Sequence, residues 1–596
     1  MMVPRSFDIM SGLHRREFLH RTLKASVGLG TAVTTIGKHD AMAESVHAAD
    51  LILRGGKIYS LDPSDSIHQA IAVSGRHIIG LGRNTDIDGL RAQNTRIIDL
   101  AGRTVIPGLI ESHVHALGVA RASLAGPYAE LHTIPKIQDW IQNRAAQVPP
   151  GTWILVPRND ITRLVERRHP TPAELDAACT THPVAFEAAR RWVLNTSGFH
   201  AAGMTGESAL PPGAKILRDQ RGNPRMLFGA DAKLRGLIAG PNPSEEHQLE
   251  ALRQVLGRYN AVGITSIYER ALDGAGHAIF RRLLDRDPLI RVTFSLRGTM
   301  RSEADVRRFV EQSGFKPLAG DEWLRAGSLK IVVDGGIHWG NTYLREAYGP
   351  RRAAFYVHDD PQYRGDIHYS AEEMRNVFLT AHRMGWPMCV HVTGDGAMDR
   401  VLDALEAVDR DLPVSGRRFT LCHAYFPDAR IVARCQRFGV CVDTQPAQYY
   451  RDSEAIAEVY GASWADRLIG LGQWVRGGIR VAINSDHMIG LDPDHAMNAF
   501  NPMLQMWIAV ARRNDQGNTH GPHQRLSRLQ ALRAMTTEAA WISFNEDRVG
   551  SLEPGKCADL VVLDRDPLTC REDQIPEVHA VTTIVGGRIV HQNQSG

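Results

Sequence analysis

The chain has 596 residues, of which 43% are hydrophobic and 23% are charged, a composition typical of a globular protein with a large core and more than one domain. Its formal net charge of +3 is small for this length, so charge gives no indication of a nucleic acid or another polyanion as partner. The seven cysteines include no Cys-x-x-Cys pair, which argues against a disulfide framework and against a zinc site made of thiolates.

Residues 1–43 carry features of an export signal in the expected order. Arg15-Arg16 precedes Phe18-Leu19, a mildly apolar stretch follows, and Ala41-Met42-Ala43 forms a small-x-small cleavage site. The segment resembles a bacterial twin-arginine signal, although a basic amphipathic helix would share the arginines. We therefore expect the twin-arginine export machinery as a partner and a periplasmic or secreted protein. The apolar stretch is too short to span a membrane, so no stable membrane anchor is expected.

The two ends of the remaining chain share one sequence pattern, in which short β-like runs are separated by turn residues. Such runs occur at residues 50–59 and 96–100 near the beginning, and at residues 558–564 and 581–590 near the end. Neither end has enough strands for a stable sheet. We therefore predict that residues 49–104 and 545–596 fold together as one small β-sandwich.

Between the ends, in residues 105–544, apolar strand-like runs alternate with helical patterns, which is typical of a parallel sheet wrapped by helices. The run that ends in His113 is the first, and seven more follow: Gly263–Tyr268, Ile290–Leu296, Ser328–Asp334, Met388–Thr393, Phe419–His423, Val440–Thr444 and Arg480–Asp486. Helical periodicity occurs at Glu245–Tyr259, Ala371–Met384, Asp428–Phe438, Trp464–Arg476 and Leu526–Trp541.

Eight β-α units closed on themselves make a TIM barrel of the α/β class, with its active site at the carboxyl ends of the strands. Residues 119–244 are too long for one β-α loop and contain strand candidates of their own, Trp153–Pro157 and Val184–Ala188. We interpret them as a subdomain inserted after the first barrel strand, where it could cover the mouth of the barrel.

His113 and His115 stand at the end of the first barrel strand with one residue between them. In an extended backbone this spacing points both imidazoles to the same side. Imidazole is the commonest protein ligand of zinc and suits other divalent metals. A His-x-His pair alone is a weak signal, because any surface strand can carry one.

Other strand-like runs end in residues that could complete a metal site. They contribute Lys330, His391, His423 and Asp486. A lone histidine on an apolar strand is more often a satisfied core residue, but the ends of barrel strands converge. We therefore expect these residues to bind a divalent metal together with the histidine pair, and zinc is the favoured ion.

At these positions the chain resembles the amidohydrolase superfamily, and within it the amidohydrolase-3 group that includes N-substituted formamide deformylases. The resemblance runs from about residue 49 to residue 590 and includes Val105-Ile-Pro-Gly-Leu-Ile-Glu-Ser-His-Val-His, Lys330-Ile-Val-Val-Asp-Gly, His391-Val-Thr-Gly-Asp, His423-Ala, Ser485-Asp486 and Gly550-Ser-Leu-Glu-Pro-Gly-Lys-Cys-Ala-Asp-Leu-Val-Val-Leu. It implies a metal site made of His113, His115, Lys330, His391, His423 and Asp486. In this family the lysine is often carboxylated on its amine, and the site holds one or two metal ions per chain.

The expected activity is hydrolysis of a carbon–nitrogen bond, in an amide or cyclic amide of a small-molecule substrate, by a metal-activated water. Asp486 is predicted to take the proton of this water and return it to the leaving nitrogen, since no other carboxylate is expected at a strand end so near the histidines. His423 or His391 could hold the developing oxyanion. Two alternatives stay open: hydrolytic deamination of a heterocycle, and a non-catalytic regulator on the same barrel. Self-association into a homo-oligomer is also left open.

Candidate substrate contacts follow from loops expected at the mouth. Aromatic rings there could pack against an apolar substituent of the substrate, and paired arginines could bind a carboxylate. Core packing of the rings and solvent exposure of the arginines explain the same residues equally well. The candidates are Arg190, Arg191, Trp192, His338, Trp339, Tyr449 and Tyr450.

Two departures from the family pattern leave the substrate unnamed. Residues 190–196 read Arg-Arg-Trp-Val-Leu-Asn-Thr where many relatives have a histidine in a His-Ala-x-x-Val-Asn-Ser segment, and Glu111 replaces the usual aspartate.

Overall fold

The computed structural model describes residues 48–188, 191–204, 210–211, 214–218, 221–238 and 243–593. The predicted export signal and Arg190 lie outside the described residues. No helix in the described part of the chain is long and apolar enough to cross a membrane.

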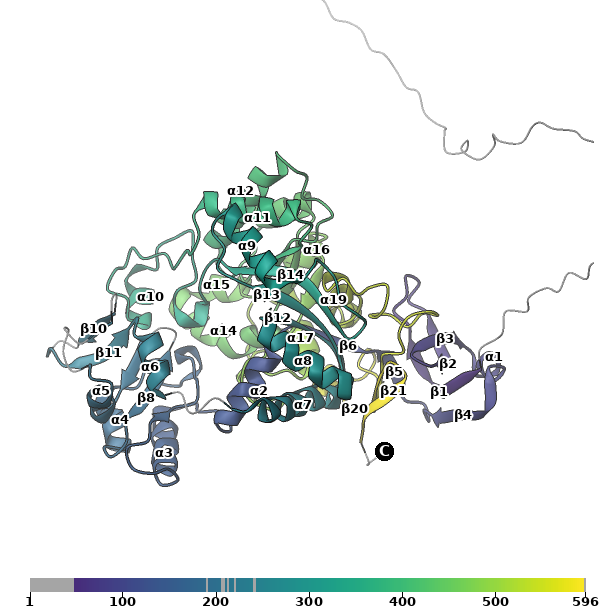
Figure 1. The fold of residues 1–596 in the computed structure, drawn as a ribbon, viewed down its shortest axis with the longest axis horizontal. Helices are drawn as coiled ribbons and strands as arrows, with labels where there is room; N and C mark the ends of the chain where they lie inside the picture. The colour runs from purple at the N-terminus through teal and green to yellow at the C-terminus, as the bar shows by residue number, and fades with distance from the viewer. Residues whose placement is uncertain are drawn as a thin grey trace, which may run out of the picture. The chain divides into compact units, whose positions relative to one another are not determined.

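The centre of the fold is a barrel of parallel strands, as predicted (Figure 1). Its sheet has eight strands in the spatial order β18-β17-β16-β15-β14-β13-β12-β6, and a parallel bridge between Val114 and His487 brings the last strand region beside the first. The strands are β6 (Leu109–Val114), β12 (Ile264–Leu272), β13 (Arg291–Arg297), β14 (Leu324–Val332), β15 (Met388–Val392), β16 (Thr420–His423), β17 (Cys441–Thr444) and β18 (Val481–Ile483).

The barrel strands are buried because helices cover their outer faces and side chains fill the interior, which explains their nearly continuous apolar runs. Strand β14 runs from Leu324 to Val332, and Lys330 pairs with Cys389, two residues before His391, so the backbone of Lys330 lies lower in the barrel than that of His391.

Helices connect the barrel strands. They are α2 (Ala116–Ala125), α7 (Glu245–Ala261), α8 (Gly274–Arg286), α9 (Glu303–Ser313), α10 (Gly349–Tyr356), α11 (Ala371–Arg383), α12 (Asp395–Asp409), α13 (Ala429–Phe438), α14 (Pro446–Tyr460), α15 (Ala462–Arg467), α16 (Leu471–Arg476), α17 (Pro502–Ala511), α18 (Arg528–Ala534) and α19 (Thr537–Ile542), with the 3₁₀ turns η3 (Ile337–Trp339) and η4 (Pro522–Gln524). Local sequence sets their limits: Ser302 caps α9 through a capping box with Asp305, and Gly314 ends the helix in the left-handed conformation.

Two predicted helices are each broken into two. The segment Trp464–Arg476 divides into α15 and α16 because Ile469 has a φ of 51° and Gly470 follows against Pro427, where a Cβ would lie 2.4 Å from Cγ of the proline. The segment Leu526–Trp541 divides into α18 and α19 at Thr536, whose φ of −132° and ψ of −92° are not helical.

The two ends of the described chain fold together, as predicted for the small β-sandwich, and their strands are hydrogen-bonded in one sheet. Hydrogen bonds connect its eight strands in the order β21-β20-β19-β5-β1-β2-β3, and β4 pairs with β1. The elements are β1 (Ala49–Tyr59), β2 (Ile67–Ser74), β3 (His77–Gly82), α1 (Asn84–Asp88), β4 (Arg91–Asp99), β5 (Thr104–Pro107), β19 (Leu560–Leu563), η5 (Glu572–Glu577), β20 (Ala580–Val585) and β21 (Arg588–Gln592).

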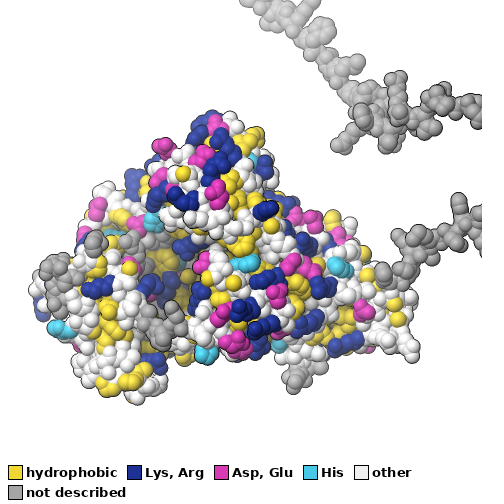
Figure 2. Space-filling view, viewed as in Figure 1, with side chains coloured by type: hydrophobic (Ala, Val, Ile, Leu, Met, Phe, Trp, Pro, Cys, Tyr) yellow, Lys and Arg dark blue, Asp and Glu magenta, His cyan; other side chains and the backbone are white. Residues whose placement is uncertain are grey.

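The insertion after the first barrel strand builds a second sheet, which stands at the left of Figure 1. Its five strands have the order β10-β11-β9-β8-β7, and they include both strands predicted there. The elements are α3 (Ile134–Ala145), β7 (Ile154–Leu155), η1 (Ile161–Arg163), α4 (Pro172–Ala178), β8 (Val184–Ala188), β9 (Arg191–Leu194), α5 (Thr196–Ala201), β10 (Lys215–Arg218), β11 (Pro224–Phe228) and α6 (Asp231–Ile238). On the face shown in Figure 2 the surface is hollowed between this subdomain and the barrel.

Candidate metal centre

The side chains predicted to bind metal meet at the carboxyl ends of the barrel strands. His113 lies in β6 and His115 directly follows it, Lys330 lies in β14, His391 in β15, His423 ends β16, and Asp486 follows β18. The backbones of His423 and Asp486 have positive φ angles of 78° and 51°. Such conformations cost on the order of 1–3 kcal/mol each outside glycine and are concentrated at functional sites.

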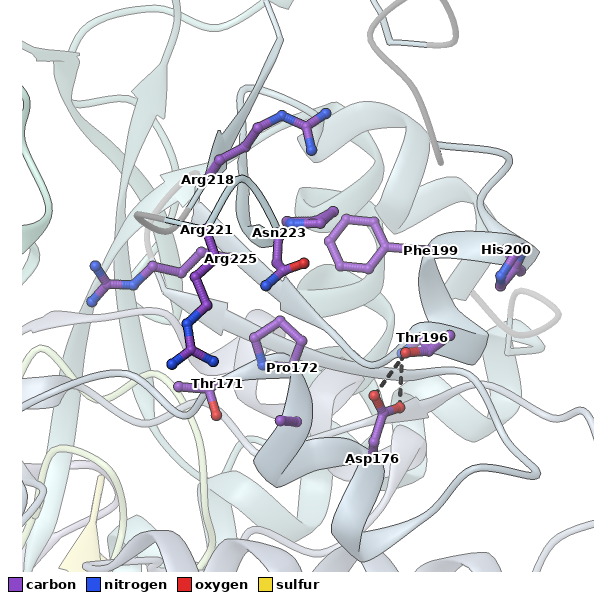
Figure 3. Close-up of a pocket in the computed structure, with 12 residues that line it drawn as sticks. Thr171, Pro172, Asp176, Thr196, Phe199, His200, Arg218, Arg221, Asn223 and Arg225 are labelled. Atoms are coloured by element: carbon purple, nitrogen blue, oxygen red, sulfur yellow. Dashed lines mark hydrogen bonds between the residues drawn. The ribbon is translucent and has the colours of Figure 1, made fainter.

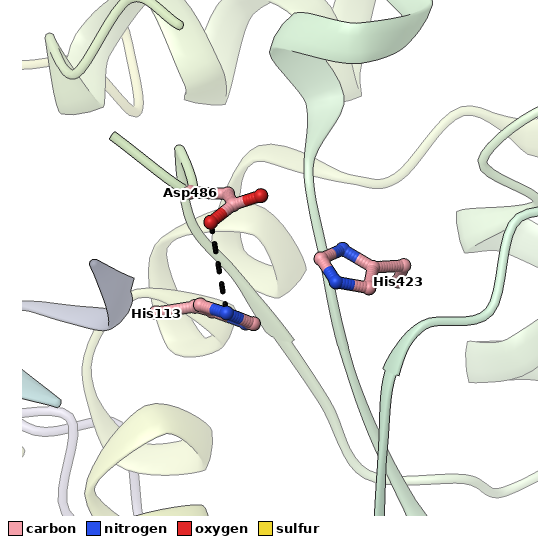
Figure 4. A group of neighbouring side chains, drawn as sticks. All are labelled: His113, His423 and Asp486. Atoms are coloured by element: carbon pink, nitrogen blue, oxygen red, sulfur yellow. Dashed lines mark ion pairs between the residues drawn. The ribbon is translucent and has the colours of Figure 1, made fainter. Parts of the chain in front are cut away.

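Asp486 lies among the imidazoles. Its Oδ1 is 3.3 Å from Nε2 of His115 and 3.6 Å from Nε2 of His113. His113, His423 and Asp486 offer ligand atoms that all lie within 4.8 Å of one another (Figure 4). The ring of His391 is 4.3 Å from that of His423 between centroids, so it belongs to the same cluster.

Lys330 also reaches the cluster. Its Nζ lies 2.9 Å from Nε2 of His113. Asp334, four residues further on, accepts hydrogen bonds from the backbone N–H groups of Tyr343, Thr393 and Gly394. Asp334 therefore anchors the loop after β14.

Each of the four histidines has its second ring nitrogen beside an acceptor of its own, which leaves the first nitrogen for the centre. Nδ1 of His113 is 3.0 Å from Asp443, and Nδ1 of His423 is 2.8 Å from Oε1 of Gln445. Nε2 of His391 is 3.0 Å from the carbonyl oxygen of Gly335, and Nδ1 of His115 is 3.6 Å from Glu269. Partners of this kind fix the orientation of metal-binding imidazoles.

The electrostatics favour neutral imidazoles at three of the four histidines around Asp486. At His115, burial lowers the pKa, but Asp486 and Glu269 raise it above its ordinary value. Burial lowers the pKa of His113, and nearby Lys330 lowers it further; burial likewise lowers the pKa of His391 and of His423. Burial alone would raise the pKa of Asp486, but the imidazoles of His113 and His115 hold it below its ordinary value. Neutral imidazole and ionised carboxylate are the forms that bind metals.

These residues fit a divalent metal ion. Oδ1 of Asp486 is buried and receives no hydrogen bond of good geometry from any described residue, although the group is surrounded by nitrogen donors. A buried polar atom left in this way is unusual. Imidazole and carboxylate ligands held by such partners are the donor set expected for zinc and similar ions.

Sequence reasoning missed residues that support this cluster. Asp443 ends β17 and Glu269 lies in β12, both within 3.6 Å of the histidines, so the expectation that Asp486 is the one carboxylate near them is wrong. Arg270 donates to Asp443 at 2.5 Å, and this ion pair holds the pKa of Arg270 above its ordinary value even though burial lowers it. Asp443 is thereby shared between His113 and Arg270, which leaves it no place in a second metal site.

Glu111 has a separate role. It accepts a hydrogen bond of 2.7 Å from the backbone N–H of Ser485, beside Asp486, and burial raises its pKa to about 8. The side chain thus connects β6 with the turn that follows β18.

The candidate substrate residues separate into two groups. His338 and Trp339 lie in η3, directly after β14, where a contact with substrate is feasible. Trp192 is buried in the core of the insertion and donates to Asp231, and Tyr449 is buried with its hydroxyl donating to the carbonyl oxygen of Arg512. The structure does not bring Trp192 or Tyr449 to the histidines. Arg190 lies outside the described residues.

Two further residues point away from the cluster. Arg191 is buried and donates from Nη2 to His358 and from Nη1 to the carbonyl oxygen of Trp339. His487 has its Nδ1 2.8 Å from the hydroxyl of Tyr259 and its Nε2 2.8 Å from the carbonyl oxygen of Gly490, so its ring is engaged outside the cluster.

A cavity of about 1010 Å³ lies in the insertion and is separate from the histidine cluster (Figure 3). Its wall includes Phe199, Arg225 and Asp176, and the carboxylate of Asp176 accepts hydrogen bonds from Thr196. None of the residues that line it belongs to a barrel strand.

Comparison with known proteins gives a consistent result. Residues 96–591 match the model of the amidohydrolase family. The N-substituted formamide deformylase of Arthrobacter pascens is 27% identical over 558 residues, which cover 90% of this chain and 97% of that protein.

Solved structures share the fold. A metal-dependent hydrolase of Pyrococcus horikoshii aligns with a TM-score of 0.66 at 20% identity, covering 88% of this chain and 99% of that one. The atrazine chlorohydrolase of Arthrobacter aurescens, determined in complex with zinc, aligns with a TM-score of 0.52 at 15% identity over 91% of this chain and 95% of that one.

Proposed function

The chain belongs to the amidohydrolase family, and from this premise we propose that it hydrolyses an N-substituted amide of a small molecule, with Asp486 as the group that moves the proton. The enzyme is a metal-dependent hydrolase that acts on carbon–nitrogen bonds other than peptide bonds. An N-substituted amide is the preferred substrate class because the similar protein of Arthrobacter pascens is an N-substituted formamide deformylase.

The residues that would hold the metal are His113, His115, His391, His423 and Asp486. When bound there, a divalent ion supplies Lewis acidity and makes a water molecule acidic enough to lose a proton near neutral pH. Burial lowers the pKa of His113, His391 and His423, which favours the neutral imidazoles that this role requires.

The observation that carries the proposal is the position of Asp486. Its carboxylate is held ionised by the surrounding imidazoles, and its buried Oδ1 has no hydrogen bond from any residue that the structure describes. In the proposed reaction, Oδ1 of Asp486 accepts a proton from the attacking water, the water oxygen bonds to the amide carbon, and the same proton passes to the leaving nitrogen as the carbon–nitrogen bond breaks.

The developing oxyanion needs a partner on the other side of the amide carbon. Nε2 of His423 carries a lone pair, because Nδ1–H of the same ring donates to Oε1 of Gln445, so this nitrogen would bind the metal and the bound ion would stabilise the oxyanion.

We further propose zinc as the ion, and a carboxylated Lys330 that allows the site to hold two ions. A protonated amine would repel a cation, whereas a carbamate supplies two anionic oxygens. Supporting this, the amine of Lys330 reaches Nε2 of His113, the nitrogen that faces the cluster. Electron density of metal-loaded protein at Lys330, together with metal stoichiometry, tests this; an unmodified amine beside a single ion would contradict it.

The activity is tested with a panel of N-formyl, N-acyl and cyclic amides and heterocyclic amines, using metal-loaded protein. We expect hydrolysis of at least one amide, and a loss of about 10²- to 10⁴-fold in kcat for Asp486→Asn. The matched control is Asp403→Asn, at an exposed acid that pairs with Arg434 on the outside of the barrel. Release of ammonia from the amines alone would favour deamination, and no turnover of either class would contradict the proposed function.

A further inference from the structure

Among the described residues, fourteen buried side-chain polar atoms have no hydrogen bond, and four of these lie on segments that meet at the mouth of the barrel. They are Oδ1 of Asp486, Oδ2 of Asp160 in the insertion, Oε1 of Gln448 at the start of α14 and Nδ1 of His338 in η3. Asp160 is 3% exposed, Gln448 3% and His338 8%. Because unpaired buried polar atoms are rare, a group of them on converging loops indicates that a ligand supplies the missing partner.

The loop after β14 places His338 close to the metal-binding histidines. The carbonyl oxygen of Gly335 is the acceptor beside Nε2 of His391. Gly336 follows Gly335, and the imidazole of His338 packs against it. A Cβ on Gly336 would lie 3.2 Å from Cε1 of that ring. His338 is therefore next to the peptide group that orients His391.

The insertion brings Asp160 to the same loop. Nε1 of Trp339 donates to Oδ1 of Asp160 at 3.1 Å, which fixes the carboxylate and leaves Oδ2 without a partner. The rings of His338 and Trp339 are 4.6 Å apart between centroids. Burial lowers the pKa of His338, and among the charged groups Asp160 opposes this shift most strongly. The carboxylate thus stands beside both aromatic side chains.

A buried ion pair fixes the insertion on the barrel at this point. Nε and Nη2 of Arg163 each lie 3.1 Å from an oxygen of Asp452 in α14, and the hydroxyl of Thr162 donates to the same carboxylate at 2.8 Å. Gln448 precedes Asp452 by one helical turn, so both side chains lie on one face of α14. Gln448 is consequently on the face where η1 docks.

Tyr425 connects this group to the catalytic carboxylate. Its ring is 5.8 Å from that of His423 between centroids. Burial raises the pKa of Tyr425, and the charges of Asp486 and Asp452 raise it further, because the phenol lies within electrostatic range of both. Tyr425 therefore lies close to His423 and within electrostatic range of Asp452, the residue one turn after Gln448 in α14.

We propose that Asp160, Gln448 and His338 form a subsite that binds a hydrogen-bond donor on the substrate, an N–H or O–H group remote from the scissile bond. This inference rests on the proposed function and names its substrate class: an amide with an amino or hydroxyl substituent, not one with a purely apolar side group. Asp160 and Gln448 offer acceptors only at the unpaired atoms, whereas His338, neutral because burial lowers its pKa, accepts or donates according to its tautomer.

The test compares matched substrates that differ only in the donor. N-(3-aminopropyl)formamide is paired with N-butylformamide, and N-methylglycolamide with N-methylpropionamide; for any other amide hydrolysed in the panel, a donor-bearing analogue is paired with its methyl counterpart. We expect a kcat/KM about tenfold or more higher for the donor-bearing member, because a site built to bind a donor discriminates strongly against its absence.

Asp160→Asn is the decisive variant. Its remaining carbonyl oxygen can keep the hydrogen bond with Trp339, while an amide N–H replaces Oδ2. We expect the preference for the donor-bearing member to fall to within about twofold, through a loss of kcat/KM on that member. Asp176→Asn in the same insertion, which contacts Thr196, is the matched control and should keep the preference.

The outcomes separate this inference from the proposed function. Hydrolysis with equal rates for both members of every pair would overturn the subsite while leaving the hydrolase intact. Equal losses on both members in Asp160→Asn would assign the residue to folding and would also overturn the subsite. The absence of any amide hydrolysis would overturn the proposed function, and with it the substrate class inferred from it.

Discussion

At the scale of residues, the cluster depends on the acceptors behind the imidazoles. Gln445 holds Nδ1 of His423 and also donates from Nε2 to Oδ1 of Asn484 at 2.8 Å, so it fixes one tautomer and one ring orientation. Partners of metal-binding histidines contribute to affinity almost as the ligands do. Metal affinity should therefore depend on these acceptor residues as well as on the ligands themselves.

Replacing this partner should weaken metal binding without removing a ligand. For Gln445→Leu we expect a loss of about 10- to 100-fold in metal affinity, measured by competition with a chromophoric chelator. Gln436→Leu, on the exposed face of α13, is the control and should bind as wild type does. An unchanged affinity in Gln445→Leu would show that His423 needs no support from this side chain.

Residues that end apolar runs could be predicted from the sequence, and those that support them could not. His113, His391, His423 and Asp486 stand out because a polar side chain after a buried strand faces the mouth of a barrel. Asp443 occupies an equivalent place but gave no signal, because a single acid within Cys-Val-Asp-Thr resembles an ordinary strand end. Its pairing with Arg270 depends on a contact across 173 residues.

At the scale of elements, the insertion and the barrel are joined through η1 and α14. The ion pair of Arg163 and Asp452 is buried, and the two residues are 289 apart in the sequence. The sequence predicted the insertion and two of its strands, yet the docking of η1 could not be foreseen, since it depends on which side chains meet across that separation.

Breaking this pair should destabilise the protein strongly. Asp452→Asn leaves a buried arginine without its counter-charge, and we expect a loss of about 3–5 kcal/mol in the free energy of unfolding. Glu250→Gln, which removes an exposed pair with Arg253, is the control and should cost less than about 1 kcal/mol. Chemical denaturation measures both, and equal small effects would contradict the role assigned to the pair.

The ion pair of Arg163 and Asp452 should also make the free energy of unfolding depend on pH. Although burial raises the pKa of Asp452, Arg163 holds it below its ordinary value. A carboxylate with a lowered pKa in the folded protein stabilises it above its unfolded pKa of about 3.9, and this contribution is lost as pH falls through the folded value. The destabilisation by Asp452→Asn should therefore be constant from about pH 5 to 7 and shrink below about pH 4. A difference that grows on acidification would be contrary to this reasoning.

At the scale of the whole molecule, both ends of the described chain share one sheet, and the barrel lies between them in sequence. The fold class was predictable because strand and helix patterns alternate so regularly. Helix limits were less so: the breaks at Gly470 and Thr536 follow from tertiary packing, which the apolar periodicity does not encode.

The export signal predicted at residues 1–43 is tested on the full chain. Replacing Arg15 and Arg16 by lysine should leave the precursor in the cytoplasm, because the receptor of the twin-arginine pathway reads the arginine pair. Fractionation with antibody detection measures it. Normal processing and yield outside the cytoplasm would show that this segment is not a twin-arginine signal.

The central claim, that the barrel mouth is a metal centre, is tested most directly by elemental analysis of protein purified without chelator. The ligand set of His113, His115, His391, His423 and Asp486 predicts at least one equivalent of a divalent ion per chain, with zinc foremost. Less than about a tenth of an equivalent of any transition metal in correctly folded protein would contradict the account.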